Sequence, residues 1–229
     1  MYNKYLVIIT AENKEKYISN TIKSCLNQKL CKKLKILVVY SKLSNENTLK
    51  NDFKSFKNII FLKDIIKKKL PTQDQLYKIE RASSLISNEW VLLLDGDDLF
   101  DPHKISYLDK LKLKKDHIYL NDFVSINKNS ANSYYKRKVY KELLLYKKLF
   151  NDWPEKINTS SIVLHGNLLK NFYKVHNPYK WKFLAIDVQL ILFYFYKNKF
   201  VHLDKILTFK KENINNLDKT FTNYFKKKY

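Results

Sequence analysis

Three carboxylates surround one of the chain's two glycines in the segment Asp95-Gly96-Asp97-Asp98. They directly follow residues 90–94, an almost purely apolar run that is typical of a strand buried on both faces. On an extended backbone Asp95 and Asp97 project to the same side, and Gly96 allows a ligand to approach closely. Unpaired charge at the end of a buried strand is costly, and Mg²⁺ or Mn²⁺ commonly binds one or two carboxylates together with substrate phosphates. The segment therefore predicts a site for a metal–diphosphate complex.

Helix capping is the alternative interpretation for the carboxylates of this region. Asp98 or Asp101 can cap the helix that follows, and Asp101-Pro102 fits an N-cap with proline at the first helical position. We favour the capping role for Asp101, and the ligand-binding role for Asp95 and Asp97.

A fourth candidate, Asp187, lies within the apolar residues 184–190. An apolar setting raises the pKa of a carboxylate, which suits a general base. The competing interpretation is a first-turn helix residue that the helix dipole favours. The five histidines show no metal-ligand spacing, and Cys31 has no His–Asp arrangement that would make it a nucleophile.

The first 123 residues alternate between short apolar runs and stretches with helical periodicity. Such alternation implies parallel strands that are joined by right-handed helical crossovers. We expect strands at residues 6–9, 34–40, 59–62, 90–94 and 117–123. We expect helices at 17–26 and 75–87 and from Asp101 onward, and the end of a short helix at 51–57. Because ligands of such sheets bind at the carboxyl ends of the strands, the site is expected after Ile9, Tyr40 and Leu94.

The alternation weakens after residue 124. The remaining patterns predict helices at 136–150 and 183–197, a strand at 160–165 and a strand pair at 200–209. No segment has the composition of a linker, so we expect one domain over residues 1–229, whose second half packs on the same sheet. Residues 211–229 form a basic C-terminal tail.

The formal charge is +22, from 44 Lys and Arg against 22 Asp and Glu, which invites a nucleic-acid interpretation. Arg81 and Arg137 are the only arginines, whereas sequence-specific DNA readers depend on bidentate Arg. We therefore expect no specific nucleic-acid partner, and peripheral contact with an anionic membrane instead. Two cysteines cannot form a disulfide framework, and the first residues lack a signal-peptide pattern. These features predict a cytoplasmic protein that contacts the inner face of the membrane.

These segments, in this order, resemble the family 2 glycosyltransferases of the GT-A fold. The strand that ends in Leu94-Asp95-Gly96-Asp97-Asp98 is similar to the family's strand with its D-x-D motif. Residues 7–13 resemble the opening strand and nucleotide-contacting turn of the family, and residues 21–28 resemble its first helix. Ser160-Ser161-Ile162-Val163 is similar to the later strand near the acceptor site. The resemblance covers residues 4–210 and rests on the order and spacing of the motifs.

The resemblance implies an α/β fold of the GT-A type, with a Rossmann-like, mostly parallel central sheet flanked by helices. It implies a nucleotide-sugar-binding half at residues 1–123 and an acceptor-binding half at 124–210 on the same sheet. The implied reaction is a metal-dependent, inverting transfer of a sugar from a nucleotide-diphosphate donor to an acceptor hydroxyl. Such transfer commonly serves the assembly of surface glycans or polysaccharides, with a glycan or lipid-linked glycan as acceptor.

The resemblance also implies roles for single residues. Asp187 falls at the position of the catalytic base, and Asp97 at that of the ligand of Mn²⁺ or Mg²⁺. The residues implied for nucleotide-sugar binding are Thr10, Ala11, Glu12, Tyr40, Asp95, Gly96 and Asp97.

The chain is a diverged member on this interpretation. Tyr40-Ser41 stands where the family usually has an acidic pair, and Lys210-Lys211 stands where it has a late Arg/His stretch. One alternative is a non-catalytic basic binding module, for anionic lipid or nucleic acid, that retains a degenerate GT-A fold. A sugar-phosphate nucleotidyltransferase is a poorer match, because residues 10–16 contain neither the Gly nor the Arg of its phosphate loop.

Overall fold

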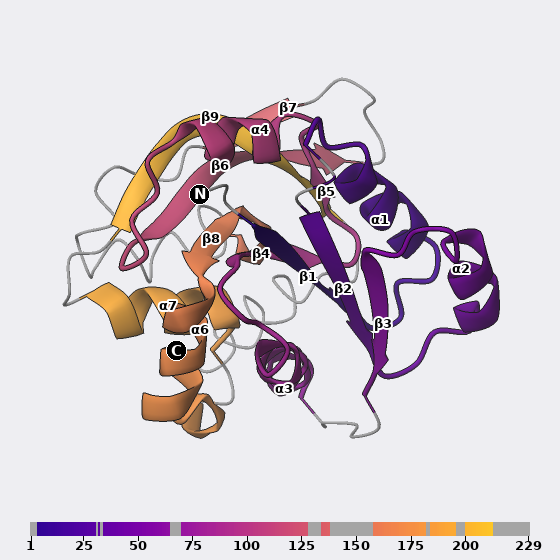
Figure 1. The fold of residues 1–229 in the computed structure, drawn as a ribbon. Coiled ribbons are helices and arrows are strands. Elements are labelled where there is room, and N and C mark those ends of the chain that lie inside the picture. The colour runs from indigo at the N-terminus through magenta and orange to yellow at the C-terminus, as the bar shows by residue number, and fades with distance from the viewer. Residues whose placement is uncertain are drawn as a thin grey trace.

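The computed structural model describes residues 4–30, 32, 34–64, 70–127, 134–137, 158–181, 184–195 and 200–212. Within these residues a nine-stranded sheet runs in the order β3-β2-β1-β4-β8-β6-β9-β5, and β7 pairs with β6 beside this path (Figure 1). The strands are β1 (Tyr5–Ala11), β2 (Leu34–Tyr40), β3 (Ile59–Lys63), β4 (Trp90–Asp95), β5 (Leu99–Phe100), β6 (Ile118–Asn127), β7 (Tyr134–Arg137), β8 (Ile162–His165) and β9 (Phe200–Glu212). The α-helices are α1 (Ile18–Leu26), α2 (Glu46–Asp52), α3 (Pro71–Ser83), α4 (Lys104–Lys110), α6 (Gly166–Val175) and α7 (Ile186–Phe195), and two 3₁₀ turns are η2 (Thr159–Ser161) and η3 (Pro178–Trp181).

The N-terminal part of the sheet is parallel, as the alternation of strands and helices predicts. β1 lies between β2 and β4 and pairs in parallel with both, and β3 pairs in parallel with β2. In this register Thr10 lies opposite Asp95, and Ala11 lies opposite Tyr40. The carboxyl ends of β1, β2 and β4 therefore meet at one edge of the sheet, where ligands of such folds bind.

The C-terminal half extends the same sheet, as expected, but with mixed strand directions. β8 is antiparallel to both β4 and β6, whereas β6 and β9 are parallel to each other. The two-residue strand β5 follows the carboxylate turn and pairs antiparallel with β9. This pairing brings the end of β9 back to the turn after β4, although the two segments are more than 100 residues apart in the sequence.

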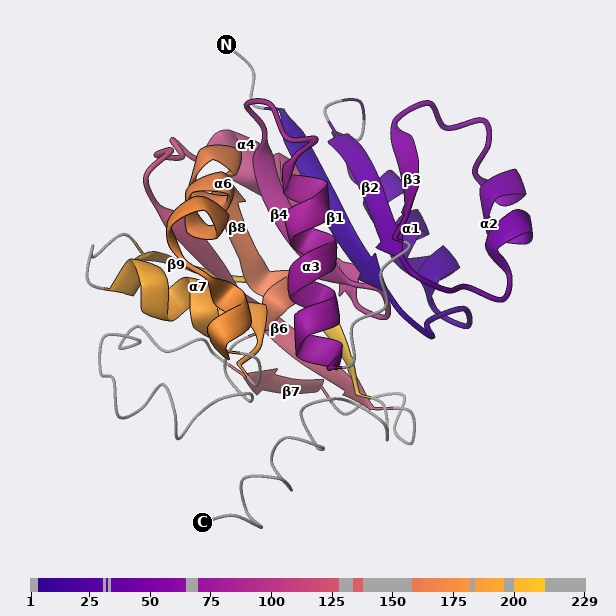
Figure 2. The same ribbon diagram turned by 90° about the horizontal axis from the view of Figure 1, so that it is seen from below.

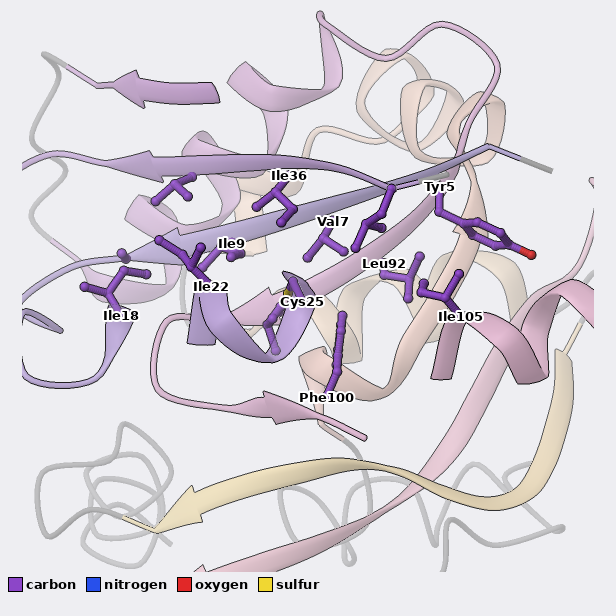
Figure 3. Packing of buried hydrophobic residues seen from close by; sticks show 14 of the residues in the cluster. Tyr5, Val7, Ile9, Ile18, Ile22, Cys25, Ile36, Leu92, Phe100 and Ile105 are labelled. Atoms are coloured by element: carbon purple, nitrogen blue, oxygen red, sulfur yellow. The ribbon is translucent and has the colours of Figure 1, made fainter. Parts of the chain in front are cut away.

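Side chains of the central strands alternate between two hydrophobic clusters, one on each face of the sheet. Leu6 and Ile8 pack on the face that α3, α6 and α7 cover together (Figure 2). Tyr5, Val7 and Ile9 point to the other face, where α1 and α4 pack against them (Figure 3). A strand buried on both faces needs apolar residues at every position, which explains the uninterrupted apolar runs of β1 and β4.

The helix after the carboxylate segment begins later than predicted. α4 begins at Lys104 with His103 as N-cap, so the prediction that Asp101 caps this helix is wrong. Asp101 instead holds the turn that precedes the helix, because its Oδ1 accepts a hydrogen bond from the His103 amide at 2.8 Å. Its carbonyl accepts a second bond from the Lys104 amide at 3.0 Å.

Residues 200–209 form part of one long strand, β9, rather than the predicted strand pair. β9 pairs with β6 from Phe200 to Glu212, and the register shifts around Asp122 leave Asp204, Lys205 and Leu207 without a partner residue in β6. A bulge of this kind allows a strand to bend without ending. β9 therefore continues past the polar pair Asp204-Lys205 as one strand.

Other boundaries differ at the ends of elements or were missed. The sequence predicts no helix at α6 and no strand at β5 or β7. Of the helix predicted at 183–197, Leu184 and Ala185 precede α7, and residues 183, 196 and 197 lie outside the described part of the chain. Of the helix predicted at 136–150, residues 136–137 belong to β7, and residues 138–150 lie outside the described part of the chain. Among the described residues, no helix is both long and apolar enough to cross a lipid bilayer.

Candidate active site at the carboxyl edge of the sheet

Gly96 is the point at which the carboxylate turn touches β1. Its amide donates a hydrogen bond to the Thr10 carbonyl at 2.9 Å, and its carbonyl accepts one from Thr21 Oγ1 at 3.1 Å. A Cβ at this position would lie 3.0 Å from the Thr10 carbonyl oxygen and 3.2 Å from Ala11 Cα. The carboxylate turn therefore needs glycine at position 96, because its backbone lies so close to the backbone of β1.

Asp95, at the end of β4, is partly buried beside other carboxylates. Its Oδ1 accepts a hydrogen bond from Gln75 Nε2 at 2.7 Å, and its backbone amide donates to Ser160 Oγ at 3.0 Å. Burial raises the pKa of the Asp95 carboxyl well above its usual value, and repulsion from Asp98 and Asp97 adds to the rise. The site thus concentrates more negative charge than its surroundings compensate.

Asp98 is held from three sides. Its Oδ2 accepts hydrogen bonds from Ser160 Oγ at 2.7 Å and Asn158 Nδ2 at 3.2 Å, and its Oδ1 accepts one from the Lys211 amide at 2.9 Å. Burial and the neighbouring Asp97 raise the pKa of Asp98 to about 6, although the bond from Ser160 opposes the rise. Asp98 therefore ties the turn to η2 and β9, and it does not cap α4.

A fully buried lysine lies beneath this turn. Lys104 Nζ donates hydrogen bonds to the Ser160 carbonyl at 2.9 Å and to Thr208 Oγ1 at 3.0 Å, and it lies 3.9 Å from the centroid of the Phe100 ring. Burial lowers the pKa of Lys104 well below its usual value, while the nearby Asp98 charge opposes this. Lys104 and Thr208 thereby fix Ser160 from below. Sequence reasoning missed both residues, because neither belongs to a motif.

Asp97 faces the loop that follows β1. Its Oδ2 lies 2.5 Å from Lys14 Nζ in an ion pair, in which the Asp97 side chain is 7% exposed and the Lys14 side chain 29%. Sequence reasoning singled out Asp97 but not Lys14. The loop can reach the turn because β1 and β4 are adjacent and end level with each other.

The predicted nucleotide-contacting residues after β1 lie at the same edge. Ala11 is buried in the core, whereas Thr10 and Glu12 are partly exposed. Glu12 Oε2 accepts a hydrogen bond from Lys78 Nζ at 2.9 Å, and Lys78 also pairs with Asp74. The buried Lys78 thus anchors Glu12 to α3.

Tyr40 lies at the end of β2, but its side chain points into the protein. The residue is 0% exposed and belongs to the hydrophobic cluster under α1. Burial raises the pKa of its phenol, which lies beside Lys50 and Glu46. In this conformation the ring is packed in the core, so a base cannot stack on it. Its assignment to nucleotide binding stays a prediction.

Asp187 reaches the same site from the other half of the chain. It lies in the first turn of α7, is 5% exposed, and its Oδ1 accepts a hydrogen bond from the Val188 amide at 2.8 Å. Its charge contributes to the rise of the Asp95 pKa, so the two carboxylates are close enough to interact. The fold thus brings together two candidates that lie 92 residues apart in the sequence.

The end of β9 supplies basic groups to this edge. The Lys211 amide binds Asp98, and its Nζ lies 3.8 Å from the centroid of the Tyr17 ring. The charge of the neighbouring Lys210 lowers the pKa of Asp98. Lys210 and Lys211 therefore lie beside the carboxylates. They come from the end of the sequence, whereas Lys14 comes from its beginning.

The donor set suits a hard divalent cation that completes its shell elsewhere. Among the described residues, no three His, Cys, Asp or Glu side chains are grouped so that they could hold a metal ion. Mg²⁺ and Mn²⁺ sites commonly use one or two carboxylates plus phosphate and water oxygens, and Asp97 and Asp95 fit that role. Burial and repulsion from Asp98 and Asp97 raise the pKa of Asp95, and a bound cation would relieve the repulsion.

Residues 6–172 match the family model of glycosyl transferase family 2. No curated protein matches the chain. Among solved structures, S. aureus TarS 1–349 in complex with UDP has a TM-score of 0.65 and 17% identity, over 92% of this chain and 61% of that one. The complex of the same protein with UDP-GlcNAc gives 0.66 and 16%, over 95% and 61%. The glycosyltransferase GlyE of Streptococcus pneumoniae TIGR4 gives 0.50 and 12%, over 97% and 60%.

At these identities the likeness to solved structures shows the fold, and the chain spans about three fifths of the length of the TarS fragment. The family match carries more weight, since it runs from β1 into α6 and includes the whole carboxylate turn. This chain therefore belongs to glycosyl transferase family 2 and has the GT-A fold.

Proposed function

We propose that this protein is a metal-dependent inverting glycosyltransferase, which moves a sugar from a nucleotide-diphosphate donor to an acceptor hydroxyl. The observation that carries the proposal is the meeting of the Asp95–Asp98 turn with Asp187 at the carboxyl edge of the sheet. The turn suits the leaving diphosphate, and Asp187 suits the acceptor hydroxyl. Both lie in a family that carries out sugar transfer.

The donor is proposed to bind across the ends of β1, β2 and β4. The TarS structures in complex with UDP and UDP-GlcNAc support a nucleotide-sugar donor. The proposed contacts are Thr10, Ala11, Glu12, Tyr40, Asp95, Gly96 and Asp97. Of these, Thr10 and Glu12 have partly exposed side chains, and Tyr40 would have to contribute through its backbone or leave the core.

Asp97, with Asp95 beside it, is proposed to hold Mn²⁺ or Mg²⁺. Such an ion acts as a Lewis acid that stabilises the charge of a leaving diphosphate. Lys210 and Lys211 are well placed to add positive charge, because they lie beside Asp98 at the same edge. The hydrogen bonds that fix Asp95 and Asp98 keep the turn from moving as charge develops.

Asp187 is proposed to be the general base. A carboxylate on the face opposite the leaving group can accept the proton of the attacking hydroxyl as the new bond forms. Attack from that face inverts the anomeric configuration. The position of Asp187 in the first turn of α7, buried and near Asp95, supports this role.

The acceptor is proposed to be a glycan or lipid-linked glycan in surface polysaccharide assembly. A cytoplasmic location with peripheral contact at the inner face of an anionic membrane suits such an acceptor. The surplus of lysine supports this contact, since each Lys near an anionic surface contributes about 1 kcal/mol.

A screen of donor hydrolysis across nucleotide sugars, with and without Mn²⁺, tests this proposal. We expect turnover of one donor class that requires Mn²⁺ and is lost in Asp97→Asn. Asp52→Asn removes an exposed carboxylate at the end of α2 and serves as the matched control, with unchanged turnover. The proposal is contradicted if the protein turns over no donor but binds RNA or anionic vesicles in a salt-sensitive way that Asp97→Asn does not change. That result would indicate the non-catalytic binding module instead.

A further inference from the structure

The ion pair between Lys14 and Asp97 lies where the proposed function needs a metal ion. Lys14 Nζ is 2.5 Å from Oδ2 of Asp97, the carboxylate proposed to hold the divalent cation. A protein ammonium and a divalent cation compete for the same carboxylate oxygen, because both are attracted by its charge. In the structure described here, the protein's own cation holds that oxygen.

The backbone of Lys14 is anchored, while its side chain is able to move. The Lys14 carbonyl accepts hydrogen bonds from the Tyr17 and Ile18 amides at 2.8 and 2.9 Å, at the start of α1. Asn13 just before it adopts a left-handed backbone conformation with φ 52°. The lysine side chain is 29% exposed and its stem has four rotatable carbons, so the ammonium can leave Asp97 without unfolding the loop.

The charge of Lys14 acts on more than one carboxylate of the turn. Its ammonium contacts Asp97, and Asp95 and Asp98 belong to the same four-residue turn. Lys14 therefore compensates part of the negative charge of the turn as a whole. A divalent cation at Asp97 would supply this compensation itself and make the ammonium redundant there.

We propose that Lys14 is the resident counterion of Asp97, which a divalent cation displaces when the metal–nucleotide complex binds. The displaced ammonium then pairs with a phosphate oxygen of the nucleoside diphosphate. This inference rests on the proposed function for the identity of the ligand. It adds Lys14, which no sequence motif marks, to the proposed site. It also gives a mechanism by which binding of the divalent cation and binding of the nucleoside diphosphate are coupled.

The coupling follows from the competition. A metal ion alone must break the Lys14–Asp97 pair, so it binds weakly. A diphosphate offers the ammonium a new partner, so metal and nucleotide bind more tightly together than separately. By linkage each ligand strengthens the other by the same factor.

Titration of Mn²⁺, followed by the electron paramagnetic resonance signal of the free ion, tests the inference without any turnover. The titration is run with and without UDP on the wild type, Lys14→Gln and Lys16→Gln. Lys16 is an exposed lysine of the same loop, so its substitution removes the same charge away from Asp97. Circular dichroism confirms that each variant is folded, and Lys14→Arg, which keeps the charge, should behave like the wild type.

We expect Lys14→Gln to bind Mn²⁺ alone at least about tenfold more tightly than the wild type, because the competing charge is gone. UDP should then strengthen Mn²⁺ binding by a factor at least about tenfold smaller than in the wild type. Lys16→Gln should change either quantity less than about twofold.

One further result separates the inference from the proposed function, and two others overturn both. If UDP strengthens Mn²⁺ binding in the wild type but Lys14→Gln behaves like Lys16→Gln, the inference is wrong and the proposed function stands. If the wild type binds no Mn²⁺ even with UDP, while Lys14→Gln binds it, Lys14 blocks the site instead of yielding it, and both the displacement and the metal dependence of the proposed function are wrong. If neither protein binds Mn²⁺ under any condition, both are overturned.

Discussion

Ser160 is the residue whose loss should loosen the carboxylate turn most. Its Oγ accepts a hydrogen bond from the Asp95 amide at 3.0 Å and donates one to Asp98 Oδ2 at 2.7 Å, and the residue is fully buried. Ser160→Ala leaves the partly buried Asp95 amide without this acceptor, which costs about 1–3 kcal/mol, and removes a bond to a charged group worth about 1.5–3 kcal/mol. We expect the free energy of unfolding to fall by about 3 kcal/mol.

The neighbouring Ser161 is a matched control. It is equally buried, but its Oγ donates to the Asn158 carbonyl at 2.6 Å, which also accepts a bond from the Ser161 amide. Ser161→Ala therefore removes one neutral bond, leaves no lone acceptor, and should cost about 1 kcal/mol.

Urea unfolding followed by tryptophan fluorescence measures both changes, and calorimetry with UDP and Mn²⁺ measures the site. Ser160→Ala should weaken binding of the metal–nucleotide complex about tenfold or more, because Asp95 and Asp98 lose a shared anchor. Ser161→Ala should leave that binding within about twofold of the wild type. Equal losses of stability and of affinity in the two variants would refute the account of Ser160 as the brace of the turn.

Three more predictions concern Asp187, Cys25 and Gly166. Asp187→Asn should keep UDP binding but abolish sugar transfer, since the amide cannot accept the proton; undiminished transfer in a product assay would remove Asp187 from the mechanism. Burial raises the pKa of Cys25 to about 12, so in the Cys31→Ser variant iodoacetamide at pH 8 should modify Cys25 only after unfolding; rapid modification of the folded protein contradicts this. Gly166→Ala places a Cβ 2.3 Å from Ile86 Cγ2 and should lower the free energy of unfolding by about 1–3 kcal/mol in a urea titration, and an unchanged midpoint would show that Ile86 gives way freely.

The sequence was sufficient for the N-terminal sheet, because its signals are local. Apolar runs such as residues 90–94 and the helical spacing after Tyr17 are patterns within one element. The carboxyl-edge rule then places Thr10 and Asp95 together without any knowledge of contacts, and the structure has them opposite each other. The same rule says nothing about Asp187, whose place beside Asp95 depends on how α7 packs.

The residues that the sequence did not reveal act through contacts between distant segments. Lys104 is one lysine among many in the sequence, yet it is fully buried and bonded to Ser160 and Thr208. Lys14 stands in a loop whose composition is unremarkable until the position of Asp97 is known. The resemblance places Tyr40 among the nucleotide-sugar-binding residues, but its ring lies in the hydrophobic cluster on the α1 side of the sheet, and that position depends on how the helices pack on the sheet.

The central claim is that this edge of the sheet binds a nucleoside diphosphate through a metal held by Asp97. Isothermal titration of UDP into the protein, with and without Mn²⁺, and the same titration of Asp97→Ala, test it most directly. The account predicts binding that Mn²⁺ strengthens at least about tenfold in the wild type and leaves unchanged in Asp97→Ala. UDP binding that is indifferent to Mn²⁺, or a Mn²⁺ effect that survives in Asp97→Ala, would contradict it.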